Sequence, residues 1–243
     1  MKVFTYYMPV PELWSEKSQR ALIDIWARSW RKQGWEPVVL TEDDAKRHPN
    51  YSDYKKKLWA LPTEYGHEYE GSCFIRWLAV AMAGGGTMVD YDVINYGFLP
   101  SDVPTDGKMS IIANDQSLPQ DWVPGGGYQA GIFMGAVVGQ QQHFQGMSDI
   151  FAAWVPDEYD MNTTSKTYYG MHCSDLTMLI RMFDSKKSPK PDWLSRCDGC
   201  SIVGHPRWET AKLVHYTGEM RATGYWPKTE LEKLRPFDGG IKA

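Results

Sequence analysis

The sequence has little of what would place this chain in a membrane, in a secretory pathway or on nucleic acid. No stretch approaches the roughly 18 consecutive apolar residues that a membrane-spanning helix needs. The start, Met1 to Tyr7, lacks the long apolar segment of a signal peptide. Acidic residues outnumber basic ones, 30 to 26, whereas non-specific nucleic-acid binding needs a dense positive surface. We therefore expect a cytoplasmic protein with no transmembrane segment and no nucleic-acid partner.

Cysteine is also scarce, and without a secretion signal the four thiols are expected to be reduced. Cys197 and Cys200 form a lone Cys-x-x-C pair. A structural zinc site would need two more ligands, which Cys173, His172 or His205 could supply. A redox role has less support, because no thioredoxin-like strand and helix surround the pair. Zinc at this pair stays open as an alternative.

What is present is an ordinary globular composition, with 42% hydrophobic and 23% charged residues over 243 positions, enough for a substantial core. Strand-like residues at 2–7 and 37–40 flank an apolar helical stripe at 17–33, an order typical of parallel α/β sheets. We read residues 1–243 as one domain of α/β class. Irregular loops are predicted at 114–130 and 184–200, and the further predicted elements are helices at 51–61, 72–83, 139–154 and 174–183 and strands at 87–90, 109–113, 131–138 and 212–216.

Asp90 and Asp92 stand at the end of the predicted strand 87–90, two residues apart. In an extended chain alternate side chains point the same way, so both carboxylates can reach one cation. Mg²⁺ and Mn²⁺ prefer oxygen ligands and keep coordination positions open for phosphate. Ligands of open α/β sheets also bind at the carboxyl ends of strands. The alternative is a turn with two exposed aspartates, because Asp-x-Asp is a short pattern.

A longer pattern surrounds this pair. Arg76 opens an apolar helical stretch that leads to Gly84-Gly85-Gly86, and Asp90-Tyr91-Asp92-Val93 follows. This order and spacing resemble the donor-binding core of retaining glycosyltransferases with the GT-A fold. That group includes the yeast mannosyltransferase that initiates outer chains, the glucosylating clostridial toxins, and capsule and lipopolysaccharide transferases. The resemblance is tight over residues 76–93 and implies a GT-A-like, Rossmann-type mixed sheet flanked by helices.

The same resemblance implies that Asp90 and Asp92 hold Mn²⁺ or Mg²⁺, and that Arg76 contacts the nucleotide-sugar donor. Asp92 and Arg76 would then belong to the catalytic residues. Two positions depart from the family pattern. Met88 replaces the usual aromatic residue, and Cys73 stands where the family carries an aspartate that contacts the donor sugar. The resemblance therefore does not specify the sugar.

A second segment, from Leu213 to Arg221, resembles the His-x-x-Gly-x-x-basic segment of related retaining transferases. It implies His215 as the third protein ligand of the metal, with Gly218 and Arg221 at the donor diphosphate. A neutral imidazole is a good Mn²⁺ ligand, and glycine lets the backbone approach phosphate. The alternative is an ordinary histidine at the end of a strand.

Three further predictions concern the donor. Asp175, at the start of the predicted helix 174–183, corresponds to a position where similar enzymes face the donor sugar, which implies a third catalytic residue beside Asp92 and Arg76. Asp is also a common first-turn residue of helices. Tyr6 and Tyr7 end the first strand, where such folds hold the nucleobase, and Tyr91 lies inside the Asp-Tyr-Asp motif. Residues 1–113 would bind the nucleotide sugar, and 114–243 would provide the acceptor side and a closing segment.

The sequence thus predicts a metal-dependent glycosyltransferase of hexosyl type. It would move a sugar from a UDP-linked donor, with GDP as the alternative nucleotide, to a glycan or other hydroxyl acceptor, with retention. A nucleotide-sugar hydrolase, a nucleotidyltransferase and a non-catalytic nucleotide- or sugar-binding module are the alternatives. The missing G-x-x-x-x-G-K-[ST] segment weakens nucleotidyl transfer. Two carboxylates so close on one strand cannot easily flank a sugar ring, which disfavours a glycosidase.

Overall fold

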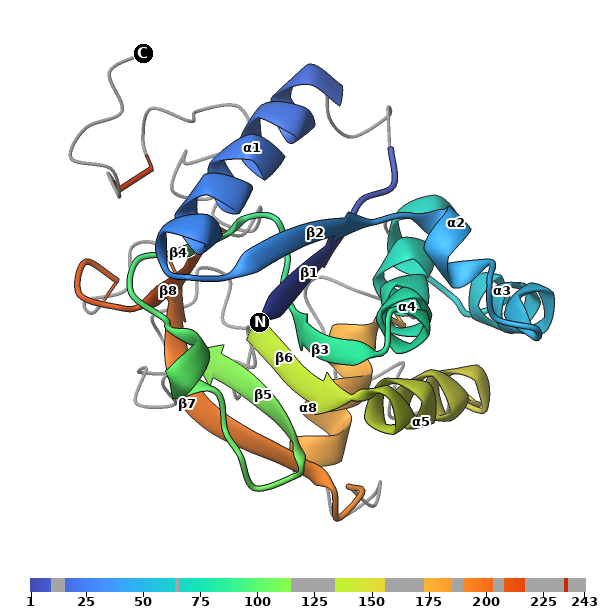
Figure 1. Ribbon diagram of the computed structural model, residues 1–243. Helices are drawn as coiled ribbons and strands as arrows, with labels where there is room; N and C mark the ends of the chain where they lie inside the picture. Colours follow the sequence, from blue (N-terminus) through green and yellow to red (C-terminus); the bar gives the residue numbers. More distant parts are fainter. Residues whose placement is uncertain are drawn as a thin grey trace, which may run out of the picture.

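The computed structural model describes residues 1–9, 16–63, 66–114, 134–155, 173–184, 190–202, 208–216 and 234–235. Its centre is one mixed sheet of eight strands in the order β2-β1-β3-β6-β5-β7-β8-β4, with helices on both faces (Figure 1). The α/β class and the mixed sheet flanked by helices that the sequence predicts are therefore confirmed.

The chain begins with a strand–helix–strand unit. β1 (Lys2–Tyr6) pairs in parallel with β2 (Glu36–Leu40), and α1 (Glu16–Lys32) connects them. The apolar stripe of α1 is buried, with Trp26 and Trp30 at 0% exposure. The unit agrees with the prediction. A helix with one apolar face, between two short apolar strands, buries that face by packing on the parallel sheet that the strands form.

Three helices follow, α2 (Glu42–Ala45), α3 (Tyr51–Trp59) and α4 (His67–Met82). The predicted start of α4 at residue 72 is wrong by more than one turn. Ser72 has the residue type of a helix cap, but its hydroxyl donates to the carbonyl of Tyr69 at 2.6 Å, inside the helix. The helix ends as predicted, because Gly84 adopts a φ of 95° directly after the last turn.

β3 (Gly85–Met88) then enters the sheet between β1, its parallel neighbour, and β6, its antiparallel neighbour. β4 (Val93–Asn95), a short 3₁₀ turn at Pro100–Asp102 and β5 (Met109–Asn114) come next. After residues 115–133, β6 (Met134–Gln140) leads directly into α5 (Gln141–Ala152). The predicted strands and helices of this region agree with these elements within a few residues.

The last described elements are α8 (Asp175–Asp184), β7 (Leu194–Ile202) and β8 (Leu213–His215). β7 contradicts the prediction of an irregular stretch at 184–200. It pairs in parallel with both β5 and β8, so it lies inside the sheet and not at its edge. Residues such as Asp198 and Gly199 have low strand propensity, so the sequence does not predict a strand here. Pairing with β5 and β8 outweighs that low propensity.

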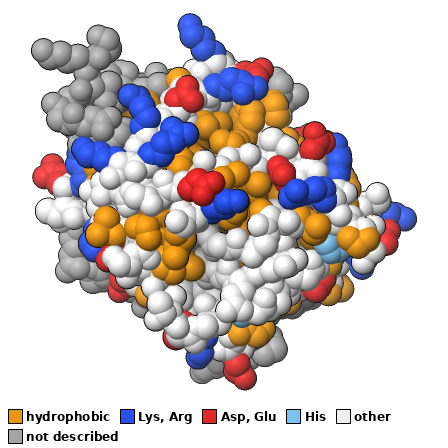
Figure 2. All heavy atoms as spheres, viewed as in Figure 1, with side chains coloured by type: hydrophobic (Ala, Val, Ile, Leu, Met, Phe, Trp, Pro, Cys, Tyr) orange, Lys and Arg blue, Asp and Glu red, His pale blue; other side chains and the backbone are white. Residues whose placement is uncertain are grey.

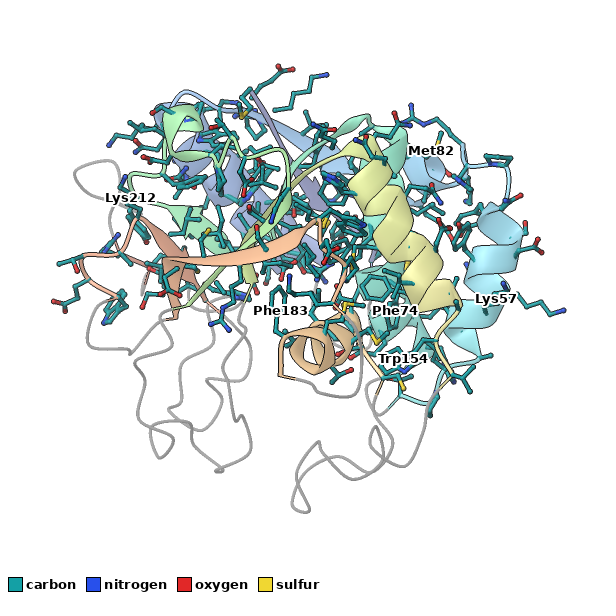
Figure 3. The ribbon with its side chains drawn as sticks, turned by 90° about the horizontal axis from the view of Figure 1, so that it is seen from below. Lys57, Phe74, Met82, Trp154, Phe183 and Lys212 are labelled. Carbon is teal, nitrogen blue, oxygen red and sulfur yellow. The ribbon has the colours of Figure 1, made fainter. Side chains whose placement is uncertain are left out.

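Two hydrophobic clusters cover the two faces of the sheet. One contains buried side chains of α3, α4, α5 and α8, where Figure 3 shows Phe74, Trp154 and Phe183 beneath the sheet. The other lies under α1 and includes β8 and Leu234. Because α1 contacts both β2 and β4, the first and last strands of the sheet, the sheet curls around this second cluster (Figure 1).

The surface carries both signs of charge. On the face shown in Figure 2, lysine and arginine side chains are interspersed with acidic ones and do not merge into one continuous basic surface. No helix among the described ranges has the length and apolar content needed to cross a membrane.

Gly85 is a position where any side chain should destabilise the protein. Its φ is 79°, and a Cβ would lie 2.5 Å from the backbone nitrogen of Gln141. We expect Gly85→Ala to lower the free energy of unfolding by about 1–2 kcal/mol from the left-handed backbone alone, with overpacking adding about 1–3 kcal/mol. Gly107→Ala is the matched control, because Gly107 has a φ of 77° and open space around it. Urea denaturation of both variants measures the difference, and equal losses would contradict the packing argument.

Candidate metal centre

The Asp90-Tyr91-Asp92 segment is a turn between β3 and β4. The amide of Val93 donates to the carbonyl of Asp90 at 2.9 Å, which closes a four-residue turn. The expected extended conformation is therefore wrong at this point. The two carboxylates come together because the chain reverses, and not because alternate residues of a strand face the same way.

His215 reaches the turn through the sheet. β8 lies beside β4 (Figure 1) and pairs with it antiparallel, and the register of this pairing sets His215 opposite Val93. Its Nε2 lies 3.3 Å from Asp92 Oδ1 and 3.8 Å from Asp90 Oδ2. The amide of Tyr216 also donates to the carbonyl of Asp92 at 2.9 Å, so the backbone fixes the two segments to each other.

The α1 helix holds β4 from the other side. The indole of Trp30 donates to the carbonyl of Val93 at 3.1 Å, and the hydroxyl of Ser29 accepts from the amide of Asn95 at 3.2 Å. All four of these residues are buried. The strand that carries the turn is thus fastened both to β8 and to the first helix of the chain.

Asp90, Asp92 and His215 have the chemistry and spacing of a divalent-cation site. One ligand atom from each residue lies within 4.8 Å of the other two, and no other such group of three occurs in the described part of the chain. With metal–oxygen bonds of about 2.1 Å, ligands at adjacent octahedral positions lie about 3 Å apart. The 3.3 Å between His215 and Asp92 is close to that separation. Carboxylate and imidazole together suit Mn²⁺, and carboxylate oxygens suit Mg²⁺.

Arg76 connects this group to a third carboxylate. Its Nη1 donates to Asp90, and its Nη2 and Nε donate to Oδ2 of Asp175 at 2.6 and 3.1 Å. The same Asp175 oxygen accepts from the indole of Trp77 at 2.8 Å. Burial disfavours the charge on Arg76, but the carboxylates of Asp175 and Asp90 outweigh it and raise its pKa, so it stays charged.

Three carboxylates and one guanidinium therefore form the cluster, which leaves two more negative than positive charges when His215 is neutral. Asp92 is 5% exposed and Asp175 is 2% exposed. Buried charge is costly unless it is compensated, and one divalent cation would balance this excess. A small pocket opens beside the cluster, lined by Arg76, Met88, Val89, Asp90, Gly135, Ala136 and Val137.

The three tyrosines predicted at the donor lie on different sides of the sheet. Tyr7 meets Tyr91 edge to face, with ring centroids 6.4 Å apart, and the Arg20 guanidinium lies 5.4 Å from the Tyr7 ring centre. Tyr6 packs in the opposite cluster, where burial and the nearby Glu42 carboxylate raise the pKa of its phenol. The structure thus brings Tyr7 and Tyr91 to the motif and Tyr6 to the far face.

Sequence reasoning missed part of the neighbourhood that α4 provides. Tyr69, Cys73 and Arg76 are spaced four and three residues apart, so they follow one side of the helix. Burial first, and then the charge of Glu70, raise the pKa of the Cys73 thiol. A correct helix start at residue 67 would have revealed this row. The polar contact of Trp77 with Asp175 leaves no mark in the sequence, because tryptophan is ordinarily read as an apolar residue.

Some predicted residues cannot be placed. Gly218 and Arg221 lie outside the described residues, as do His172 and His205 of the zinc alternative. Cys197 and Cys200 belong to the cluster under α1, whereas Cys173 lies in the cluster on the opposite face. Of the described residues, none completes a group of three metal ligands around the cysteine pair.

Comparisons with known proteins give distant likenesses. A family model described as a domain of unknown function (DUF8765) matches residues 1–102. No curated protein matches the sequence. The fold is similar to an active-site mutant of LgtC, with a TM-score of 0.49 and 11% identity over 96% of this chain and 100% of that chain. The galactosyltransferase LgtC with donor and acceptor sugar analogues gives a TM-score of 0.48, 11% identity and the same coverage.

The apo-form glycosyltransferase GlyE of Streptococcus pneumoniae TIGR4 is similar with a TM-score of 0.44 and 10% identity, over 89% of this chain and 54% of that chain. At such low identity and TM-score, these likenesses do not extend to the chemistry of the site.

Removal of Asp175 should destabilise the protein, because Arg76 would lose one of its two carboxylate partners in a buried setting. Breaking a buried ion pair costs about 3–5 kcal/mol, and since Asp90 remains we expect Asp175→Ala to cost about 3 kcal/mol of unfolding free energy. Glu16→Ala breaks the exposed pair with Arg20 and should leave the urea midpoint almost unchanged. A urea midpoint for Asp175→Ala as high as that of the control would contradict a stabilising role of the Arg76–Asp175 ion pair.

The raised pKa of the Cys73 thiol predicts slow alkylation of this residue near neutral pH. Only the thiolate reacts with iodoacetamide, and a pKa above the ordinary value of 9.0 leaves less thiolate at pH 8. We expect the labelling rate of Cys73, followed by peptide mass spectrometry, to keep rising above pH 9. N-acetylcysteine is the reference thiol. A rate that reaches its plateau below pH 8.5 would show that burial and Glu70 do not control this thiol.

Proposed function

We propose that this protein is a metal-dependent glycosyltransferase that moves a sugar from a UDP-linked donor to an acceptor hydroxyl, with retention at the sugar carbon. The observation that carries the proposal is the approach of His215 to Asp90 and Asp92 across the β4–β8 pairing. Two sequence segments that separately resemble transferase motifs meet at one point. Two exposed aspartates in an ordinary turn would not be expected to lie beside a buried imidazole from a distant segment of the chain.

The residues present fit a divalent cation. Asp90, Asp92 and His215 would hold Mn²⁺ or Mg²⁺, and the cluster has the negative excess that such an ion balances. When bound, the ion supplies Lewis-acid stabilisation of the negative charge that develops on the departing diphosphate. Two carboxylates and an imidazole leave coordination positions open, so phosphate oxygens have room to bind beside the protein ligands.

The chain's own residues would then orient the donor. Arg76 is held by Asp175 and Asp90 beside the pocket, which fixes a positive charge near the donor and costs no reorganisation during the reaction. Asp175 acts on the donor side chiefly by holding Arg76, since its Oδ2 already accepts three hydrogen bonds. Tyr7 and Tyr91 offer ring surface for the nucleobase beside the turn.

Other parts of the proposal come from the sequence resemblance. Gly218 and Arg221 would contact the diphosphate. Attack from the face of the leaving group needs no strong general base in the protein, because the departing phosphate oxygen accepts the proton of the acceptor hydroxyl. We take residues 1–243 as one transferase domain, with residues 1–113 on the donor side and 114–243 on the acceptor side.

A panel of nucleotide-sugar donors, incubated with and without Mn²⁺, tests the proposal. We expect metal-dependent consumption of one UDP-sugar, and we expect Asp92→Asn to lower that rate by about a hundredfold or more, the scale of losing a group that stabilises developing charge. Asp53→Asn, an exposed change on α3, is the control and should keep the wild-type rate.

Equal rates for wild-type protein and Asp92→Asn would contradict the proposal. Adding candidate hydroxyl acceptors separates the enzyme classes. A transferase gives a glycosylated product, whereas a nucleotide-sugar hydrolase gives only free sugar and UDP. Binding of Mn²⁺ and UDP without turnover of any donor would identify a non-catalytic module.

A further inference from the structure

Two residues near the C-terminus pack against the edge of the sheet that carries the candidate metal centre. Leu234 is 3% exposed and lies in the hydrophobic cluster under α1, together with Leu213 and Val214 of β8. Arg235 follows it. Neither residue belongs to a helix or strand, and neither is near the Asp-Tyr-Asp motif in the sequence. Their position therefore depends on side-chain contacts.

Arg235 contacts its neighbours through its guanidinium, its backbone amide and its backbone carbonyl. Its Nη1 and Nη2 donate to the carbonyls of Trp208 and Ala211 at 2.7 and 2.8 Å. The guanidinium lies 3.5 Å from the ring centre of Tyr96. The backbone amide donates to the hydroxyl of Tyr216 at 3.0 Å, and the backbone carbonyl accepts from the hydroxyl of Tyr96 at 2.8 Å. Lysine would keep the two backbone contacts but could not reproduce those of the guanidinium, because it has no planar fork.

The two tyrosines are the residues that directly follow the two strands of the site. Tyr96 follows β4, Tyr216 follows β8, and their hydroxyls are 2.6 Å apart. The amide of Tyr216 is also the donor to the Asp92 carbonyl. Arg235 thus clamps the ends of the strands that bring His215 to the aspartates.

Such a clamp matters because the pairing it supports is short. β4 and β8 share three residue pairs, from Val93↔His215 to Asn95↔Leu213. β8 is also paired in parallel with β7, so β4 is the edge strand that depends on this short ladder. Because β7 also holds β8, a slip of β4 by one residue would move Asp92 away from His215. Backbone hydrogen bonds from Tyr96 to Lys212 and from Tyr216 to Asp92 extend the ladder at its two ends, and Arg235 holds the side chains of both tyrosines.

We propose that Arg235 is a positioning residue for the metal ligand His215: by clamping Tyr96 to Tyr216 it keeps β8 in register with β4. The inference deepens the proposed function and rests on it for the role of the metal. It assigns Arg235 no contact with the ion or with the donor. It predicts that a change far along the chain from both aspartates weakens metal binding through the placement of the imidazole.

The first measurement is Mn²⁺ affinity, by isothermal titration calorimetry on the full chain. We expect Arg235→Lys to weaken Mn²⁺ binding by roughly tenfold, the usual lower scale for losing an outer partner of a metal ligand. Tyr96→Phe, which removes one hydroxyl, is a milder variant that should act in the same direction. Arg28→Lys, an exposed change on α1, is the matched control and should bind as the wild type does.

A double-mutant cycle separates positioning from general destabilisation. In a His215→Ala background the imidazole is gone, so Arg235→Lys should have no further effect on Mn²⁺ affinity. An equal loss in both backgrounds would overturn the inference, because Arg235 would then act through the stability of the whole fold. An Arg235→Lys protein with wild-type affinity would overturn it as well.

Hydrogen exchange of the metal-free protein gives a readout that does not depend on the proposed function. The amide of Tyr216 donates to Asp92, so it should exchange faster in Arg235→Lys and Tyr96→Phe, while amides of α4 keep their rates. Unchanged exchange at Tyr216 overturns the inference whatever the metal data show. If the wild type binds Mn²⁺ but consumes no donor, the proposed function fails while the positioning role of Arg235 stands.

Discussion

The antiparallel pairing of β8 with β4 is the contact on which the candidate metal centre depends. β4 begins at the residue after Asp92, and β8 ends at His215, so pairing their ends brings an imidazole to two carboxylates. Few backbone hydrogen bonds hold this ladder. Contacts from α1 and from Arg235 support it. The site is thus built from an edge of the sheet that several distant segments fasten in place.

Electrostatics gives the site its chemical character. Arg76 is buried between Asp90 and Asp175, and it neutralises only one of the three carboxylates in the cluster. The remaining negative excess lies around Asp90, Asp92 and His215, and Arg76 and Asp90 also line a small pocket. A cluster of this kind attracts a divalent cation and, through the cation, an anionic ligand. Asp175 and the Trp77 indole hold the arginine in place, so that the charge near the ligand is preorganised.

Particular elements show why sequence reasoning succeeded and where it failed. The strand–helix–strand start was predictable, because periodic apolar residues and Gly34 mark α1 clearly. β7 was missed because its polar and glycine residues look irregular until β5 and β8 pair with it. The aspartates of the motif were correctly paired for the wrong reason. They converge through a turn closed by Val93. The sequence alone does not distinguish such a turn from the last residues of the strand before it.

The sequence by itself determined the class of the fold, the helices with clear apolar stripes and the residue types that suggest a cation site at Asp90, Asp92 and His215. These features are local, since periodicity and composition act over a few turns of chain. Only the tertiary structure decided which side chains meet. The partnership of Arg76 with Asp175, the register that sets His215 opposite Val93 and the clamp by Arg235 join segments far apart in the chain. Such contacts depend on how the whole sheet assembles, and no local pattern encodes them.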